Sequence, residues 1–194
     1  MVRAILEGRK TQTRMVVKPP LWWEGHRITG TTPHGRSSRY QDILSSWDGG
    51  RQMFCPRGQP GDRLWVRETF YPSPNDVPTF CGFYRATDQD RDVNWKPSIF
   101  MPRLASRLTL EITGIRVERL PDISEEDARA EGVQCSGCES TEHRHCDNLG
   151  QKFRQLWESI HGPGSWDRNP WVWAITFEEI PQAPAQAKPR KVKP

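Results

Sequence analysis

The sequence contains no apolar run long enough to cross a membrane, which excludes an integral membrane protein of the helical kind. It also has no charged and apolar N-terminal leader before a cleavage site, so we expect a cytoplasmic protein. Only five cysteines are present, and a reducing cytoplasm disfavours disulfides between them. At 194 residues, one domain with additional loops is the economical expectation, because a second core would leave each half small.

Acidic residues are absent from the tail, residues 181–194, whose four basic side chains account for the formal net charge of +4. The neutral body is asymmetric: residues 1–107 hold 17 Lys and Arg against 10 acids, and residues 108–180 hold 7 against 14. This asymmetry predicts either a basic face for phosphates opposite an acidic rim, or two halves of one barrel whose charges interleave. The Pro, Ala and Gln of the tail predict disorder, and its charges would add nonspecific affinity for nucleic acid or solubility.

The first motif that carries chemistry is Gly8-Arg9-Lys10-Thr11-Gln12-Thr13-Arg14. Residues 1–6 before it suit a short helix, and Gly8 suits the left-handed turn that ends one. In the extended chain that follows, Lys10 and Thr13 would lie on opposite faces, so they converge only if a twist or bulge intervenes. Taken alone, such a basic turn entering a strand is typical of a solvated edge.

Further elements follow in a fixed order. Pro60-Gly61-Asp62 predicts a turn that opens a strand over residues 63–69, and residues 108–118 alternate apolar and polar side chains as a second strand. Ser124 is a good N-cap for a helix with acids in its first turn, and Gly132 fits its C-terminal stop. A further helix is predicted by the helical spacing of Phe153, Leu156, Trp157 and Ile160. A last strand is predicted by the alternation of Trp171, Trp173, Ile175 and Phe177.

The collinear order of these motifs resembles the ASCH family, and more narrowly its phage and prophage branch, from Met1 to about Ile180. The resemblance implies an α+β fold of the PUA-like type, a small mixed β-barrel, partly open, with flanking helices at its mouth. It also implies RNA, single-stranded nucleic acid or a modified nucleoside as partner, in a bacterial or phage-infected cell. Similar phage proteins have a short strand before the first helix, so we expect either an internal start or a barrel without that edge strand, which would expose backbone groups.

Some small bacterial ASCH proteins are amidohydrolases that remove the acetyl group from N4-acetylcytidine, and their Lys, Thr and Glu match Lys10, Thr13 and Glu131. The resemblance implies that a partly desolvated Lys10 accepts the Thr13 hydroxyl proton while Thr13 attacks the acetyl carbonyl. Glu131 would orient Lys10 or handle the proton delivered to the leaving amine. Arg9, Arg14 or backbone amides would stabilise the oxyanion.

Other residues could contact a nucleic acid. Residues 22–57 are expected to form a long loop over the barrel mouth, in which Trp22 and Trp23 either stack bases or simply cover the barrel. Arg67 would grip phosphates. Glu68 is an ordinary surface carboxylate if its strand face points outward, and a buried acid that needs Lys10 or an arginine if it points inward.

Cysteine and histidine gather in an insert at residues 134–150, which interrupts the family pattern. Five soft ligands lie there within twelve residues: Cys135, Cys138, His143, His145 and Cys146. Tetrahedral zinc prefers four such ligands, so the three cysteines and one histidine predict a structural zinc knuckle rather than a catalytic metal. A redox-active pair and ordinary reduced thiols are the alternatives.

Several functions therefore stay open. The first is an amidohydrolase acting on an N4-acylated cytidine in a nucleoside or RNA, which needs no catalytic cofactor. The second is a noncatalytic module that binds RNA or single-stranded nucleic acid. A ribonuclease would fall between them, although the sequence offers no clear histidine pair for one, and a protein-binding role in phage assembly or host takeover is a further alternative. A Lys10 amine within hydrogen-bonding reach of Thr13 and Glu131, in one pocket, would favour the enzyme, whereas a solvent-facing Lys10 with a continuous basic groove would favour binding.

Overall fold

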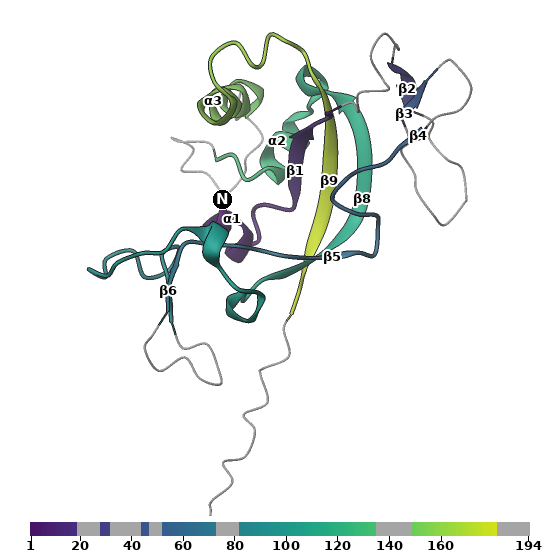
Figure 1. The fold of residues 1–194 in the computed structure, drawn as a ribbon. Helices are drawn as coiled ribbons and strands as arrows, with labels where there is room; N and C mark the ends of the chain where they lie inside the picture. The colour runs from purple at the N-terminus through teal and green to yellow at the C-terminus, as the bar shows by residue number, and fades with distance from the viewer. Residues whose placement is uncertain (19–27, 32–43, 47–51, 73–81, 135–148, 182–194) are drawn as a thin grey trace, which may run out of the picture. The chain divides into compact units, whose positions relative to one another are not determined.

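The computed structural model describes residues 1–18, 28–31, 44–46, 52–72, 82–134 and 149–181, and Figure 1 shows it as a ribbon. The chain divides into two compact units: Met1–Asp62 with Ile112–Glu178, and Arg63–Glu111 with Glu179–Pro194. The helices are α1 (Val2–Leu6), α2 (Glu125–Ala130) and α3 (Leu149–His161), with short 3₁₀ helices η2 (Ser98–Phe100), η3 (Arg103–Ala105) and η4 (Leu120–Asp122). The strands are β1 (Gln12–Val16), β2 (Ile28–Thr31), β3 (Leu44–Ser46), β4 (Gln52–Met53), β5 (Arg63–Trp65), β6 (Phe70–Tyr71), β7 (Phe83–Tyr84), β8 (Thr109–Arg119) and β9 (Trp171–Ile180).

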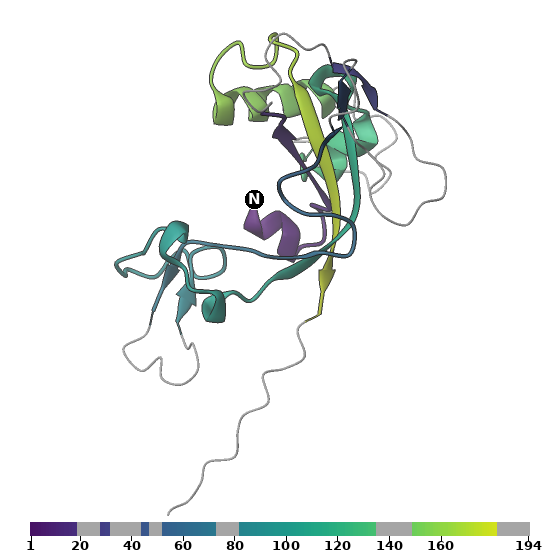
Figure 2. The same ribbon diagram turned by 45° about the vertical axis from the view of Figure 1, so that its right-hand side comes forward.

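The largest sheet has four strands in the order β1-β9-β8-β5. β1 pairs antiparallel with β9, with Thr13 opposite Ile175, and within the second unit β5 pairs antiparallel with the first residues of β8. Both ribbon views show β8 and β9 side by side and curving along their length (Figures 1 and 2). A curled antiparallel sheet with few helices confirms the predicted α+β class.

β8 confirms the strand predicted at residues 108–118, but its alternation is not simple. Leu110 and Ile112 are buried, and the next buried pair, Ile115 and Val117, begins three residues later, across Gly114. Because side chains alternate with a period of two, this spacing changes the phase of the pattern and exchanges the faces of the strand. The sequence pattern therefore described only the first half of β8 correctly.

β9 was predicted from alternation, yet Val172, Trp173, Ala174 and Ile175 are all buried. The physical reason is its central position: β1 and β8 flank it in the sheet, and both of its faces are covered. Val172 packs into a cluster formed with side chains of η4, α2 and α3, namely Leu120, Ala128, Leu149, Phe153 and Trp157. This cluster holds the helices on the sheet.

Helix α2 begins after its predicted N-cap, and the predicted glycines follow the ends of α1 and α2. The Ser124 side chain accepts a hydrogen bond from the Asp127 amide at 3.1 Å, and the glycines that follow α1 and α2, Gly8 and Gly132, have φ angles of +67° and +87°. In α3, only part of the predicted apolar face is buried, because Leu156 and Ile160 are exposed. Among the described residues, no helix is both long and apolar enough to cross a membrane.

The segment expected as a long loop at residues 22–57 contains three short strands. β2, β3 and β4 form an antiparallel sheet in that order. The Gly, Ser and Pro content favoured a loop, whereas β-branched residues such as Ile28 and Thr31 favour an extended backbone. Local composition therefore underestimated the regular structure in this segment.

The second unit has a small core of its own. Phe70, Met101 and Ala105 are buried together, with Tyr84 packed against them. β6 and β7 form a two-stranded antiparallel ribbon that supplies two of these side chains. The Ser106 hydroxyl oxygen lies 2.9 Å from the Val66 carbonyl and 3.1 Å from the Leu108 carbonyl, so its one hydrogen links the end of η3 to the residues next to β5 and β8.

We expect Gly132→Ala to lower the free energy of unfolding by about 2–4 kcal/mol, because a Cβ there combines left-handed strain with overpacking. The new atom would lie 3.1 Å from the Ala4 Cβ and 3.2 Å from the Lys10 Cβ. Gly8→Ala is the matched control, since it also has positive φ but nothing within 4 Å, and should cost only about 1–2 kcal/mol. Chemical denaturation measures both, and equal losses would show that the contacts around Gly132 are not tight.

Candidate functional site

Lys10 is fixed by the turn that joins α1 to β1. After the left-handed Gly8, the amides of Arg9 and Lys10 both donate to the Ala4 carbonyl, at 2.8 and 2.9 Å. Lys10 then forms an isolated antiparallel bridge with Glu131, and the Thr11 amide donates to the Ala130 carbonyl at 2.8 Å. The short sequence Gly-Arg-Lys-Thr thus brings the chain against the end of α2, where Glu131 lies.

The Lys10 ammonium has three acceptors. Its Nζ lies 2.5 Å from Glu131 Oε2, 2.8 Å from the Gln12 carbonyl and 3.0 Å from the Glu131 carbonyl. The side chains of Lys10 and Glu131 are only 4% and 5% exposed. Because an ammonium group has three donor hydrogens, this arrangement gives each of them an acceptor within the protein.

Thr13 lies three residues after Lys10, within β1, and is half-buried. Its hydroxyl makes no hydrogen bond with any residue that the structure describes, and no hydrogen bond joins it to Lys10. Both residues nevertheless line the same pocket, because Lys10 precedes the regular strand, which begins at Gln12. The break in the strand before Gln12 supplies the departure from alternation that their convergence required.

Arg14 occupies the centre of a charge network beside this pair. Its side chain is fully buried and donates to Glu131 Oε1 at 3.2 Å, to Asp127 Oδ2 at 3.0 Å and to Glu118 Oε1 at 2.7 Å. The remaining partner is Gln12 Oε1, at 2.7 Å. The guanidinium therefore donates its hydrogen bonds to protein groups, and Arg14 is a positioning residue for the Glu131 carboxylate.

The network is electrically balanced. Lys10, Arg14 and Arg116 supply three positive charges, and Glu118, Asp127 and Glu131 supply three negative ones. Burial alone would raise the pKa of Asp127, but the hydrogen bond and charge of Arg116, the charge of Arg14 and a hydrogen bond from Gln12 outweigh it, so the pKa is lowered. Burial likewise disfavours the charged Arg116, yet Glu118 and Asp127 raise its pKa.

The pocket beside this network has a volume of about 330 Å³. Its charged side is formed by Lys10, Arg14 and Glu131, with Thr13 and Gly132 beside them. Its apolar side is formed by Met1 and Ala4 of the N-terminal segment and by side chains of α3, namely Phe153, Leu156, Trp157, Ile160 and His161. A few polar groups on one side and aromatic surface on the other are typical of small-molecule sites.

The aromatic side is ordered by ring contacts along α3. The Trp157 ring lies 4.1 Å from the His161 ring and 6.1 Å from the Phe153 ring, measured between centroids. The Arg14 guanidinium lies 5.8 Å from the centroid of Phe153, so a cation–π contact links the charged side to the aromatic one. The Trp157 indole nitrogen is buried and has no hydrogen-bond partner among the described residues.

The structure brings together Lys10, Thr13, Glu131 and Arg14 of the predicted site residues. Arg9 instead pairs with Glu7 and donates to the Gly132 carbonyl at 3.3 Å, at the edge of the same turn. It is therefore close to the site but does not line the pocket.

Two predicted binding residues belong to the second unit. The guanidinium of Arg67 lies 4.7 Å from the Trp65 ring centroid. Glu68 is the buried alternative of the sequence analysis, and its partner is Arg107, which donates from two nitrogens at 2.8 and 2.9 Å. An arginine partner is thus confirmed, and Lys10 is not that partner.

The remaining predicted residues, Trp22, Trp23, Cys135, Cys138, His143, His145 and Cys146, lie outside the described residues. Within the described part of the chain, no cluster of three or more His, Cys, Asp or Glu could hold a metal ion. The structural zinc knuckle stays a prediction from the sequence.

Sequence reasoning missed Gln12, Glu118 and Asp127 as partners of Arg14, and the aromatic wall of Trp157 and His161. A signal for the wall exists, because Phe153, Trp157 and His161 recur at intervals of four along one helix face. No signal links Arg14 to Glu118 and Asp127, which are more than a hundred residues away in the sequence.

Comparisons with models of protein families, with curated proteins and with solved structures find no match to this chain. Its function must therefore be argued from the chemistry of the site and from the sequence motifs. The buried charge network and the pocket beside it are the features on which that argument depends.

The lowered pKa of Asp127 predicts that the folded protein is less stable at acidic pH. Its carboxylate stabilises the fold above the unfolded-state pKa of about 3.9, and this contribution disappears as pH falls through the lower folded-state value. We expect Asp127→Asn to lower the free energy of unfolding at pH 7, by an amount that shrinks as pH falls below about 4. Denaturant titrations at pH 7, 4 and 3 measure this, with the exposed Asp122→Asn as control. A pH-independent difference would contradict the ionic role of Asp127.

Breaking the buried pair should cost far more than breaking an exposed one. We expect Lys10→Met or Glu131→Gln to lower the free energy of unfolding by about 3–5 kcal/mol, because the first leaves the buried Glu131 with Arg14 as its one cationic partner and the second leaves the buried Lys10 without an anionic one. The double variant should cost less than the sum of the two, which a double-mutant cycle would reveal. Arg9→Met, which removes the exposed pair with Glu7, should cost less than about 1 kcal/mol. A Lys10→Met protein as stable as the parent would overturn this account.

Proposed function

We propose that the chain is an ASCH protein of the phage or prophage type, with a PUA-like barrel, and that the pocket beside Lys10 binds a cytidine-type nucleoside, free or in RNA. We further propose that it is an amidohydrolase that removes an acyl group from N4 of that nucleoside. One observation carries the proposal: Lys10, Thr13 and Glu131, the residues to which the family resemblance points, line a single pocket.

The composition of the pocket supports a nucleoside as ligand. A planar base can lie against the aromatic side chains of α3, where Trp157 and His161 are already in ring contact. The Thr13 hydroxyl, which has no hydrogen-bond partner among the described residues, can donate to or accept from the polar edge of the base. The volume of about 330 Å³ is at the lower end of the range of about 300–1,000 Å³ for small-molecule sites.

The proposed reaction starts with attack of the Thr13 hydroxyl oxygen on the acyl carbonyl carbon. Lys10 must then be a neutral amine to accept the hydroxyl proton. The contact of 2.5 Å between Lys10 Nζ and Glu131 Oε2 is the route by which Lys10 loses its own proton first. Collapse of the tetrahedral intermediate breaks the C–N bond, the proton passes to the leaving amine, and water hydrolyses the Thr13 ester.

The charge network limits the roles of neighbouring groups in this scheme. Arg14 cannot serve freely as the oxyanion donor, because its guanidinium is already hydrogen-bonded to Gln12, Glu118, Asp127 and Glu131. It holds the Glu131 carboxylate in place instead. A backbone amide is then the better source of oxyanion stabilisation.

A noncatalytic nucleoside-binding or RNA-binding role is the second candidate. The observation that favours it is the saturation of Lys10, whose three donor hydrogens all have protein acceptors in this structure. Such a lysine positions Glu131 and gives the pocket its charge without entering a reaction. The two candidates share the ligand. They differ in whether the Thr13 hydroxyl attacks the acyl carbonyl carbon of that ligand.

The deciding experiment measures the release of cytidine from N4-acetylcytidine by purified protein. We expect turnover by the parent and a loss of about a hundredfold or more in Thr13→Val, which keeps the shape of the side chain but removes the nucleophile. Thr11→Val is the matched control, because Thr11 is an exposed threonine two residues away, and it should keep full turnover. Lys10→Ala should also be inactive, with its folding checked by circular dichroism.

The outcomes separate the candidates. Equal turnover in Thr13→Val and the parent would remove Thr13 as nucleophile. Binding of N4-acetylcytidine or cytidine without turnover, measured by calorimetry, would select the noncatalytic role. Neither binding nor turnover by folded protein would remove the cytidine proposal altogether.

The same proposal places the protein in the cytoplasm of a bacterial or phage-infected cell, with RNA or a modified nucleoside as partner. It needs no catalytic cofactor. The zinc expected at Cys135, Cys138, Cys146 and a histidine would be structural, because four protein ligands saturate the ion.

A further inference from the structure

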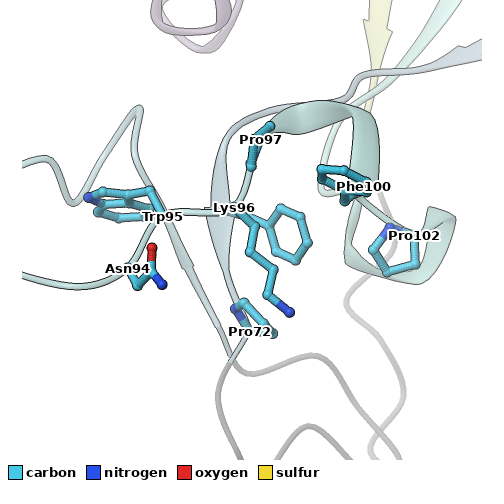
Figure 3. A pocket seen from close by; sticks show the side chains of 8 residues that line it. Pro72, Asn94, Trp95, Lys96, Pro97, Phe100 and Pro102 are labelled. Carbon is cyan, nitrogen blue, oxygen red and sulfur yellow. The ribbon is translucent and has the colours of Figure 1, made fainter.

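The second unit contains a pocket of its own, independent of the Lys10 site, with a volume of about 590 Å³. Its walls are formed largely by rings, three aromatic and three of proline: Phe70, Trp95, Phe100, Pro72, Pro97 and Pro102. Among the described residues that line it, Asn94 supplies an amide and Lys96 an amine. Figure 3 shows the Lys96 side chain between Trp95 and Phe100, with its amine directed toward Pro72.

The floor of this pocket is held firmly. Phe70 is buried in the small core with Met101 and Ala105, and it forms an isolated antiparallel bridge with Lys96. The two backbone hydrogen bonds of this bridge measure 3.1 and 2.8 Å. The backbone that carries Lys96 is therefore fixed, while its side chain remains exposed.

The rim of the pocket exposes apolar surface that its own unit does not cover. Phe100 is 69% exposed, and it follows Pro97 in the short helix η2, so its ring is presented at the surface by a fixed turn. A large aromatic side chain left in water loses the free energy that burial would give it, and exposed patches of this kind mark interaction sites.

Charge indicates which kind of ligand suits this pocket. Lys96 forms no ion pair with any residue that the structure describes, and none of the described residues that line the pocket is acidic. The pocket therefore presents a positive charge beside flat rings and repels a basic ligand. An anion attached to a planar ring satisfies both features.

We propose that this pocket binds a base and its adjoining phosphate in single-stranded nucleic acid. The base stacks against Trp95 or Phe100, the phosphate pairs with Lys96, and the Asn94 amide meets the edge of the base. A proline-rich peptide could also pack on such rings, but it would leave Lys96 without an anionic partner. The free cation therefore favours the nucleic acid, whether or not the Lys10 pocket is an amidohydrolase site.

The test is fluorescence anisotropy of a labelled oligothymidylate of about 12 nucleotides, titrated with the full chain at low salt. We expect Phe100→Ala to weaken binding by about tenfold, because it removes a stacking platform. Ile99→Ala is the matched control: Ile99 is also 69% exposed and belongs to the same 3₁₀ helix, but it does not line the pocket. Lys96→Gln should reduce the slope of log affinity against log salt by about one.

Three results would overturn the inference. One is the absence of oligonucleotide binding at low salt, or tight binding of a proline-rich peptide in its place. Another is an equal loss in Phe100→Ala and Ile99→Ala. The third is binding that survives Phe100→Ala but falls in Leu156→Ala, which would assign the oligonucleotide to the Lys10 pocket. Cytidine release from N4-acetylcytidine should be unchanged in Phe100→Ala, so the two proposals fail separately.

Discussion

Burial of the Lys10 ammonium beside the Glu131 carboxylate is the constraint on which the first unit depends. Two charges removed from water destabilise a protein unless each is fully paired. The chain meets this need with a second layer, in which Arg14 holds Glu131 and is itself held by Gln12, Glu118 and Asp127. The turn after α1, the start of β1, the C-terminal end of β8 and helix α2 are thereby fixed relative to one another within this unit.

The same network defines what the pocket can do. All three donor hydrogens of Lys10 have acceptors within the protein, two of them on Glu131. Thr13, in contrast, has a hydroxyl free of partners among the described residues and faces the pocket. The site thus combines a stable ion pair, which gives it shape and charge, with one hydroxyl that is available for chemistry or for a ligand.

The two units offer different surfaces. The first has a pocket in which charged side chains are buried and paired, and its aromatic wall comes from one helix. The second has an open pocket of aromatic and proline rings around a lysine without an ion-pair partner among the described residues. A buried network with all its hydrogen bonds made suits the selection of one small ligand. The exposed rings and the Lys96 amine of the second pocket suit the proposed contact with single-stranded nucleic acid, which would tolerate many nucleotide sequences.

The sequence by itself determined the local elements and their caps: the glycine stop after α1, the Ser124 cap of α2, and the strands β8 and β9. These follow from φ preferences, capping and side-chain period, which act between near neighbours. It also pointed to Lys10, Thr13 and Glu131, although only through family resemblance. The tertiary structure alone decided the phase change at Gly114, the burial of both faces of β9, the Arg107 partner of Glu68 and the charge network of Arg14. Each depends on which distant segments meet, because burial and pairing energies are set by contacts across the fold and leave no local pattern.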